Sequence, residues 1–375
     1  MFGARTLLGG SLLFAAIAAG CDDRAIREAE ERAKAASQPA KTQAPAATAT
    51  AKETPKIEKA DKDIFKVLPA QFESPTNPIT EEKVTLGRML YYETRMSLGQ
   101  DVSCSSCHKL DRFGVDNEPT SEGHKKQRGG RNSPTVLNAA GHVAQFWDGR
   151  AATVEDQAKG PILNPVEMAM PDAASVVRVI KSIPGYAPLF KAAFPKAADP
   201  ITYDNIALAI GAFERKITTP ARWDKYLAGD ETALTDQEKA GFAKFSKLGC
   251  PTCHNGVNVG GAQYQKLGLV NPWPDQSDLG RFEVTKNDAD KMFFRVPTLR
   301  NVAKTGPWFH KGQLTALEEV VRKMAHHQLG QELTDEDVSN LVAFLNSLTG
   351  TVDAKYVAKP ELPPSGPTTP KPRID

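Results

Sequence analysis

Aromatic side chains and net charge are both scarce in this chain of 375 residues. Only 7% of the residues are Phe, Trp or Tyr, while glycine and proline number 28 and 27. The protein part of the core is therefore expected to be thin and rich in loops. The formal net charge is +2, which gives no reason to expect nucleic acid as a partner.

A hydrophobic run long enough to span a bilayer is also lacking. The apolar stretch from Leu7 to Ala19 is short and follows a singly charged start, so it indicates a secretory signal over residues 1–20. The end of the signal and the next residue read Ile17-Ala18-Ala19-Gly20-Cys21, which resembles the lipobox of bacterial lipoproteins. We expect Cys21 to be acylated and to anchor the protein to a membrane. An ordinary signal peptide with an incidental cysteine is the alternative.

Two further segments lack the composition of a folded domain. Residues 21–62 contain only two large apolar side chains, Ile26 and Ile57. Such a segment cannot bury enough surface to offset its chain entropy, so we expect a disordered tether. Residues 351–375 form a Pro-rich tail that is expected to lie extended over the body or to be loose. The remaining residues suffice for two domains.

A Cys-x-x-Cys-His motif occurs twice and uses four of the five cysteines. The copies are Cys104-Ser105-Ser106-Cys107-His108 and Cys250-Pro251-Thr252-Cys253-His254. The two thiols can capture the vinyl groups of a haem as thioethers while the histidine binds the iron. A zinc site or redox disulfides are alternatives, but neither explains a histidine after both pairs. Two covalent haems would also compensate for the thin core.

An internal repeat relates the two halves of the chain. Pro134-Thr135-Val136-Leu137-Asn138 precedes Phe146-Trp147-Asp148-Gly149, and Pro297-Thr298-Leu299-Arg300-Asn301 precedes Phe309-His310-Lys311-Gly312. Both copies run 15 residues from Pro to Gly without a gap. The halves are therefore versions of one unit.

Helices are predicted before each haem motif and at the end of each unit. The helix before the first motif begins at Thr80, and the helix before the second begins with a capping box at 234–238. The helices that close the two units are expected over residues 204–217 and 334–350. No alternating strand pattern competes with these helices. The predicted class is all-α, with two cytochrome c-like domains over 63–225 and 226–350, each binding one covalent haem, and with long loops.

The residue on the far side of each iron decides the chemistry. The candidates in the second unit are Met292, Met324, His310, His326 and His327. We favour Met324, which lies 70 residues after His254, and interpret Met292 as core. The first unit has Asn164-Pro165-Val166-Glu167-Met168 instead. Ligation by Met168 would make the protein an electron carrier, whereas Glu167 over an open iron could move a proton.

A longer set of motifs appears in a fixed order between residues 64 and 350. It comprises both haem motifs, Gly123-His124, Arg131-Asn132-Ser133-Pro134-Thr135, Phe146-Trp147-Asp148-Gly149-Arg150, Asp156-Gln157, Gly160-Pro161, Pro165-Val166-Glu167-Met168, Val296-Pro297-Thr298-Leu299-Arg300-Asn301, Thr305-Gly306-Pro307, and Met324 before Gln328-Leu329-Gly330. In these motifs the chain resembles the bacterial di-haem cytochrome c peroxidases.

The resemblance implies a division of labour between the haems. The N-terminal haem, held by Cys104, Cys107 and His108, would be the peroxidatic one. The C-terminal haem, held by Cys250, Cys253, His254 and Met324, would transfer electrons. Glu167 as acid/base and Gln157 as hydrogen-bond partner would move a proton between the two oxygens of hydrogen peroxide. An enclosed Glu167 is expected to have a raised pKa.

The resemblance also implies roles for five further residues. His124 would cap the peroxidatic iron in the oxidised state and leave on reduction, and Trp147 would lie between the haems. Asn132, Thr305 and Pro307 would hold calcium.

The expected partners and location follow from the same resemblance and from Cys21. The electron donor would be a small cytochrome c or cupredoxin. The protein would be a homodimer in the periplasm, anchored to a membrane by its lipid. The rival functions are a di-haem electron carrier without peroxidase activity and a related oxidase of another substrate.

Overall fold

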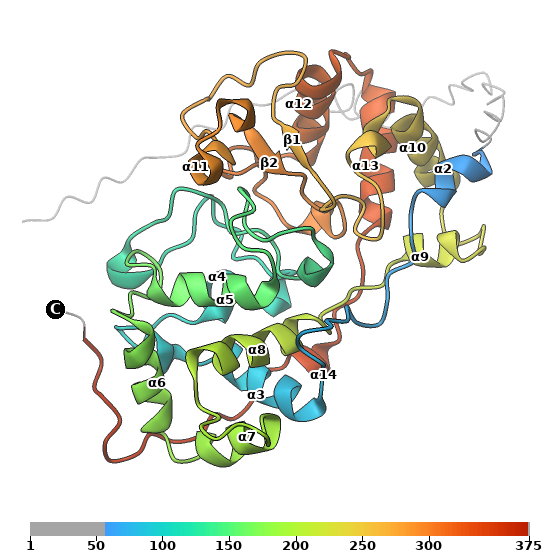
Figure 1. Cartoon of the computed structure of the whole chain (residues 1–375). Helices are drawn as coiled ribbons and strands as arrows, with labels where there is room; N and C mark the ends of the chain where they lie inside the picture. Colours follow the sequence, from blue (N-terminus) through green and yellow to red (C-terminus); the bar gives the residue numbers. More distant parts are fainter. Residues whose placement is uncertain (1–56, 374–375) are drawn as a thin grey trace, which may run out of the picture. The chain divides into compact units, whose positions relative to one another are not determined.

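The computed structural model describes residues 57–373, where most regular structure is helical (Figure 1). The α-helices are α2 (Lys59–Asp63), α3 (Glu81–Tyr91), α4 (Cys104–Cys107), α5 (Val154–Leu163), α6 (Ala173–Lys181), α7 (Tyr186–Ala193), α8 (Tyr203–Glu214), α9 (Arg222–Leu227), α10 (Asp236–Lys247), α11 (Phe282–Thr285), α12 (Leu317–Leu329), α13 (Asp335–Ser347) and α14 (Ala354–Val357). Short 3-10 turns and long loops connect them.

One small sheet departs from the predicted all-α class. Strands β1 (Tyr264–Lys266) and β2 (Phe293–Arg295) pair antiparallel, with Tyr264 opposite Arg295. Each strand has only three residues, which is too short for an alternating pattern to be recognised in sequence. The mostly helical class is otherwise confirmed.

Polar side chains begin the helices where the sequence predicts them. The Oγ1 of Thr80 accepts a hydrogen bond from the backbone N–H of Lys83 at 3.3 Å and so starts α3. Capping boxes start α10 and α13, with Thr235 and Thr334 as the N-cap residues. The helix expected over 204–217 is α8, and it ends three residues early, at Glu214.

Each half of the fold contains a pair of helices that cross at a glycine. A Cβ on Gly87 of α3 would lie 1.8 Å from the carbonyl oxygen of Ala209 in α8. A Cβ on Gly241 of α10 would lie 1.9 Å from the carbonyl oxygen of Asn340 in α13. Neither approach is possible with a side chain present. The duplication seen in the motifs therefore extends to the helix packing.

Two hydrophobic cores follow these helix pairs, but the chain ends are exchanged between them. Phe65, near the start, packs in the second core, with its ring centroid 5.3 Å from that of Trp223. Tyr356, near the end, stacks on Phe213 of the first core at 5.2 Å. Each core is thus completed by a segment from the opposite end of the chain.

The folded part begins earlier than the sequence predicts. Ile57 packs against the second core, and Lys62 forms an ion pair of 2.9 Å with Glu231. Residues 57–62, which the sequence analysis assigns to the tether, are therefore part of the fold. The signal at 1–20 and Cys21 lie outside the described residues. The helix α9 contributes Trp223 to the second core, so this core begins before residue 226.

A buried threonine joins the two repeats. Asn138 and Asn301, at the same place in each repeat, both have a left-handed backbone, with φ of 60° and 62°. The side-chain amide of each donates to the Oγ1 of Thr219 at 2.8 Å. All three residues are fully buried. Thr219 is therefore a shared acceptor between the halves.

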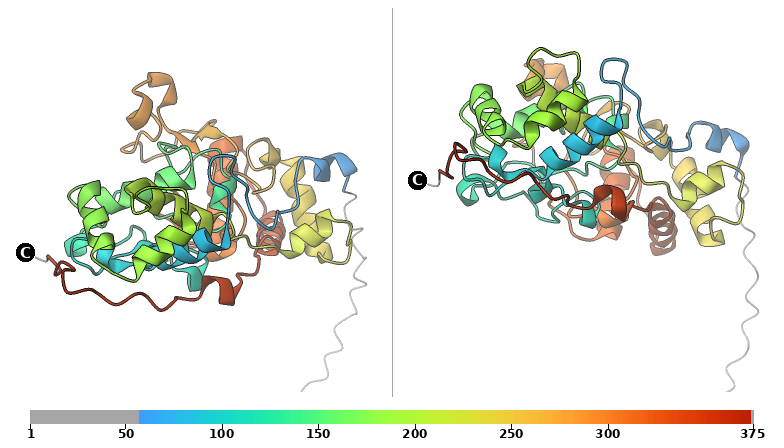
Figure 2. Two further views of the ribbon diagram at one scale, coloured as in Figure 1. Left: turned by 60° about the horizontal axis from the view of Figure 1, so that its bottom comes forward. Right: turned by 90° about the horizontal axis from the view of Figure 1, so that it is seen from below.

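The Pro-rich tail lies extended along the first half, the first of its two expected courses (Figure 2). Its last described residue, Arg373, donates its backbone N–H to the carbonyl of Leu98 at 2.9 Å. Within residues 57–373, none of the helices is both long and apolar enough to cross a membrane.

Candidate functional site

The first Cys-x-x-Cys-His motif forms one helical turn. The helix α4 begins after Ser103, whose capping box is closed by Ser106. Residues three apart lie on the same side of a helix, so the thiols of Cys104 and Cys107 face the same side. Both cysteines are free of disulfides. The turn therefore presents two attachment points to one group.

His108 follows this turn with its ring oriented for metal binding. Its Nδ1 lies 3.4 Å from the carbonyl oxygen of Gly114, which can only accept, so Nδ1 carries the proton and Nε2 is left for a ligand bond. The Tyr91 hydroxyl donates to the His108 carbonyl at 2.6 Å. Burial lowers the pKa of His108, which favours the neutral imidazole that binds iron.

The second motif shares part of this design, but it begins in a 3-10 turn (Cys250–Thr252), and the Nδ1 of His254 is buried without a hydrogen-bond partner. Cys250 and Cys253 are free of disulfides, and burial lowers the pKa of His254 to about 4. Gly114 and Gly260 each lie six residues after a motif histidine and have positive φ, 74° and 130°. A Cβ at Gly260 would lie 2.2 Å from the carbonyl oxygen of Pro297. In both units the loop after the histidine thus folds tightly back.

Buried polar atoms without partners test whether a haem fits. Arg295 is 2% exposed, its Nη1 has no hydrogen-bond partner, and burial lowers its pKa to about 10. Both ring nitrogens of His142 are also buried without a partner. A buried guanidinium without a carboxylate is strongly unfavourable. Haem carries two propionate carboxylates, so these side chains fit the group that the motifs attach.

Sequence reasoning gave no role to Arg295 or His142, since neither belongs to a motif. Their significance follows only from burial and from the charge of Arg295, which acts on His142 and helps to lower its pKa. The Cys-x-x-Cys-His copies, in contrast, were recognisable because their spacing is local.

Glu167 lies in a half-buried segment just after α5. The side-chain amide of Asn164 donates to its Oε1 at 2.7 Å. Burial raises the pKa of Glu167, while Arg150 and Asn164 act in the opposite direction. The expected raised pKa is thus found. Asn164 was not assigned a role from sequence, although an asparagine three residues before the glutamate, at a helix end, is a recognisable local signal.

The structure brings His124 to the same segment. Its backbone N–H donates to the carbonyl of Glu167 at 2.7 Å, and its side chain is 6% exposed with Nδ1 unpartnered. A Cβ at Gly123 would lie 2.2 Å from the carbonyl oxygen of Val166. The loop therefore packs its backbone directly on the Glu167 segment.

A hollow of about 330 Å³ connects this loop with the first motif. It is lined by Asp101, Val102, Ser106 and residues 122–126. Ser106 lies between the two cysteines, so the hollow reaches the attachment turn. Gln157 lies on α5, seven residues before Asn164, which follows the helix as its C-cap with an extended backbone. Among the described side chains, no hydrogen bond joins Gln157 to Glu167.

In the second unit Met324 lies on α12, a helix that the sequence analysis did not predict. Met292 packs in a cluster with Trp273 and Phe294, His326 lies beside Glu332, and His327 bonds to the carbonyl of Asn271. His310 stacks on Phe294, but its Nε2 is buried without a hydrogen-bond partner. The interpretation of Met292 as core is confirmed, and Met324 stays the predicted ligand.

Trp147 and His310 occupy the same position in the two repeats and approach one another. Their ring centroids are 6.4 Å apart. The Trp147 Nε1 donates to the carbonyl of Asn132 at 2.9 Å, and the Asn132 N–H donates to the carbonyl of His310 at 2.8 Å. Trp147 is therefore held at the seam between the two repeats, and its place between the haems stays a prediction.

The three predicted calcium residues lie in neighbouring loops. Asn132 donates to the carbonyl of Glu118 at 3.0 Å, and Asn117 donates to the carbonyl of Gly306, between Thr305 and Pro307, at 2.8 Å. Within residues 57–373, no group of three or more His, Cys, Asp or Glu residues could hold a metal ion. Calcium therefore stays a prediction.

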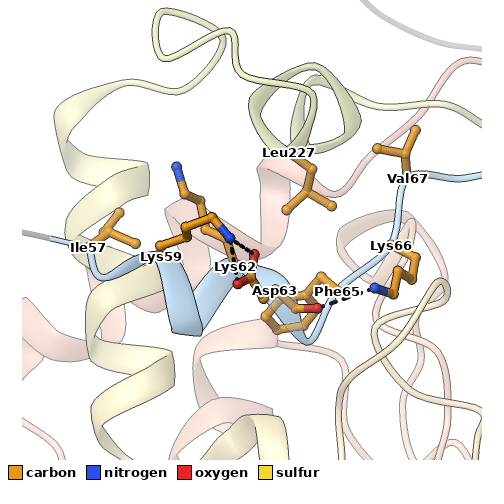
Figure 3. A pocket seen from close by; sticks show the side chains of 8 residues that line it. All are labelled: Ile57, Lys59, Lys62, Asp63, Phe65, Lys66, Val67 and Leu227. Carbon is orange, nitrogen blue, oxygen red and sulfur yellow. Dashed lines mark hydrogen bonds and ion pairs between the residues drawn. The ribbon is translucent and has the colours of Figure 1, made fainter.

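A larger hollow, of about 560 Å³, lies beside α2 (Figure 3). Phe65 and Leu227 form part of its wall, with Lys59, Lys62 and Lys66 around it. Lys59 pairs with Asp63 and Lys62 with Glu231. No haem-motif residue lines it, so volume does not locate the reaction site in this protein.

These features define a two-domain c-type cytochrome, and comparisons with known proteins specify it further. Residues 81–232 match the family model described as di-haem cytochrome c peroxidase, and residues 238–349 match that of cytochrome c. The cytochrome c551 peroxidase of Pseudomonas aeruginosa is 47% identical over 316 residues, which cover 82% of this chain and 90% of that protein. The cytochrome c551 peroxidase of Nitrosomonas europaea is 44% identical over 305 residues, 81% of this chain and 90% of that protein.

A solved structure shows the same fold. It is a MauG-like protein associated with microbial copper homeostasis, with a TM-score of 0.69 and 29% identity, and the match covers 79% of this chain and 97% of that one. The chain belongs to the di-haem cytochrome c peroxidase family. It is a cytochrome-c peroxidase, with one c-type haem motif in each half.

Proposed function

We propose that the first unit reduces hydrogen peroxide to water and that the second passes it electrons from a small cytochrome c or cupredoxin. The observation that carries this assignment is the difference between the units. The first presents Glu167, half-buried with a raised pKa, beside His124. The second offers Met324 on α12 instead. A carboxylate can move a proton, whereas a thioether can only bind iron.

Reduction of hydrogen peroxide to two water molecules consumes two electrons and two protons. The haems, when bound, supply the iron and the electron transfer for this reaction. Glu167 as carboxylate takes a proton from one peroxide oxygen and returns it to the other, which leaves as water. Asn164 fixes the carboxylate through its 2.7 Å hydrogen bond. Gln157, on the same helix α5 that leads to Asn164, would bind the peroxide.

The rival electron carrier requires a permanent second ligand on the first iron. Met168 is the thioether nearest Glu167 in sequence, but it is 2% exposed and packs in the first hydrophobic core. This packing favours a peroxidase. The decisive test is the half-reduced protein, in which the first haem should be high-spin and should bind carbon monoxide. Two low-spin haems that bind nothing would contradict the proposal.

Replacement of Glu167 by glutamine tests the proton role directly. Glu167→Gln keeps the size of the side chain and its ability to accept from Asn164, but it cannot take a proton. We expect kcat to fall between about 10²- and 10⁴-fold, as for loss of a general acid/base, with an unchanged haem spectrum. Glu283→Gln, at an exposed glutamate of α11, is the control. Full activity of Glu167→Gln would show that another group moves the proton.

Four further features complete the proposal. Cys21 would carry the lipid that anchors the protein in the periplasm, and mass spectrometry of the mature N-terminus tests it. Calcium would bind at Asn132, Thr305 and Pro307, and chelation should then alter activity. Homodimer formation, expected from the family resemblance, can be measured by light scattering with and without calcium.

His124 would cap the first iron until the second haem is reduced.

A further inference from the structure

The chain beyond α14 forms a strap over the first unit. Residues 358–373, here called the C-terminal strap, contain no helix or strand and run along the surface (Figure 2). Proline residues restrict φ and keep a chain extended without internal hydrogen bonds. The strap has six of them, at positions 360, 363, 364, 367, 370 and 372. The strap is therefore mostly extended, apart from a turn in which the backbone N–H of Thr369 donates to the carbonyl of Gly366 at 3.2 Å.

The middle of the strap is fixed to a buried charge network. Arg95 donates from Nη2 to the carbonyl of Pro363 at 2.8 Å and from Nη1 to the Ser365 hydroxyl at 3.0 Å. On its other side Arg95 holds Glu93, which is fully buried and also accepts from the Tyr186 hydroxyl at 2.6 Å. The strap is therefore attached to the core of the first unit.

The end of the strap holds the turn that precedes the first haem motif. Gln100 donates from Nε2 to the carbonyl of Pro370 at 2.8 Å. The backbone N–H of Arg373 donates to the carbonyl of Leu98 at 2.9 Å. Four residues beyond Gln100 the motif begins at Cys104. Two hydrogen bonds thus clamp the turn from outside.

The same turn contacts the Glu167 segment on its inner side. The backbone N–H of Leu98 donates to the carbonyl of Met168 at 2.8 Å. The preceding carbonyl, that of Glu167, accepts from the N–H of His124. A continuous set of backbone hydrogen bonds therefore leads from Arg373 through Leu98 to the segment that carries Glu167.

We propose that the C-terminal strap positions Glu167 for proton transfer by holding Leu98 against Met168. The strap touches neither the motif cysteines nor the carboxylate, so it acts through the turn at 98–100. This inference rests on the proposed role of Glu167. A displacement of about 1 Å at a reacting group can lower the rate by two orders of magnitude. Loss of the strap's hydrogen bonds to the turn at 98–100 should therefore lower kcat measurably.

A matched pair of substitutions tests the clamp in the whole holoenzyme. Arg373→Pro removes the backbone N–H that donates to the carbonyl of Leu98. Proline is compatible with the extended backbone here, which already contains Pro372. Arg373→Ala keeps the N–H and removes the same side chain. Hydrogen exchange should be about tenfold faster at the amides of Leu98 and His124 in Arg373→Pro, and unchanged in Arg373→Ala.

Activity measurements with a truncated chain complete the test. A chain that ends at Pro360 should lose about tenfold in kcat, with an unchanged KM for the electron donor. A synthetic peptide of residues 361–375 should restore kcat, which a merely structural defect would not allow. Arg373→Pro exchanging like wild type, or a truncated chain with full kcat, would overturn the proposal. If Glu167→Gln is fully active while exchange still accelerates, the proton role is wrong and the clamp on the turn is real.

Discussion

Thr219 offers a sharp test of how the two halves are joined. Its Oγ1 accepts hydrogen bonds from the amides of Asn138 and Asn301, both at 2.8 Å, and all three residues are fully buried. Thr219→Val has nearly the same shape but no acceptor. The side-chain NH2 group of each asparagine then loses its acceptor without access to water, which costs about 1–3 kcal/mol for each group. We therefore expect the free energy of unfolding to fall by about 2–6 kcal/mol.

Two controls separate the hydrogen bonds from the packing. Thr219→Ser keeps the hydroxyl and loses one methyl group, which costs about 1 kcal/mol. Asn301→Gly keeps the left-handed backbone, which glycine adopts readily, and removes one of the two amides. In the Asn301→Gly background, Thr219→Val should lower the free energy of unfolding by about half as much, because only the side-chain NH2 group of Asn138 loses its acceptor.

The assay is chemical denaturation of the holoprotein, followed by circular dichroism and by Soret absorbance. Coincidence of the two signals checks that both halves unfold together, which a single free energy requires. If Thr219→Val loses no more stability than Thr219→Ser, the shared acceptor contributes nothing and the halves are held by other contacts.

Two further predictions concern the first unit. Asn164→Ala removes a hydrogen bond that opposes the raised pKa of Glu167, so that pKa should rise further. The carboxylate form should then be lost at a higher pH, and the acid limb of the pH profile of kcat/KM should move to higher pH. An unmoved acid limb would contradict the assignment. His124→Gly should let the oxidised enzyme react with peroxide at once, and an unchanged need for prior reduction, measured by stopped-flow absorbance, would exclude the capping role.

The sequence predicted best what is local in the chain. Thr80, Thr235 and Thr334 mark helix starts because an N-cap interacts with residues three positions away. The haem motifs are recognisable for the same reason, and the duplication follows from a fixed spacing. The small sheet was missed because three residues give no pattern.

Contacts between distant residues were not predictable in this way. Thr219 is separated from Asn138 by 81 residues and from Asn301 by 82, and a lone threonine carries no signal of its own. Arg295 and His142 are notable only because they are buried without partners. The hydrogen bond from Asn164 to Glu167, in contrast, spans only three residues and was missed although it is local.

The exchange of chain ends between the cores has a consequence for biosynthesis. Tyr356 and Val357 complete the core of the first unit, although the helices of that unit are translated about 140 residues earlier, since α8 ends at Glu214. Domains usually fold in order as the chain emerges. Here the core of the first unit is completed by residues 356 and 357, which follow the whole second unit, whereas Phe65 is translated before the second core exists. The first unit therefore reaches its final packing only after the second unit has been translated.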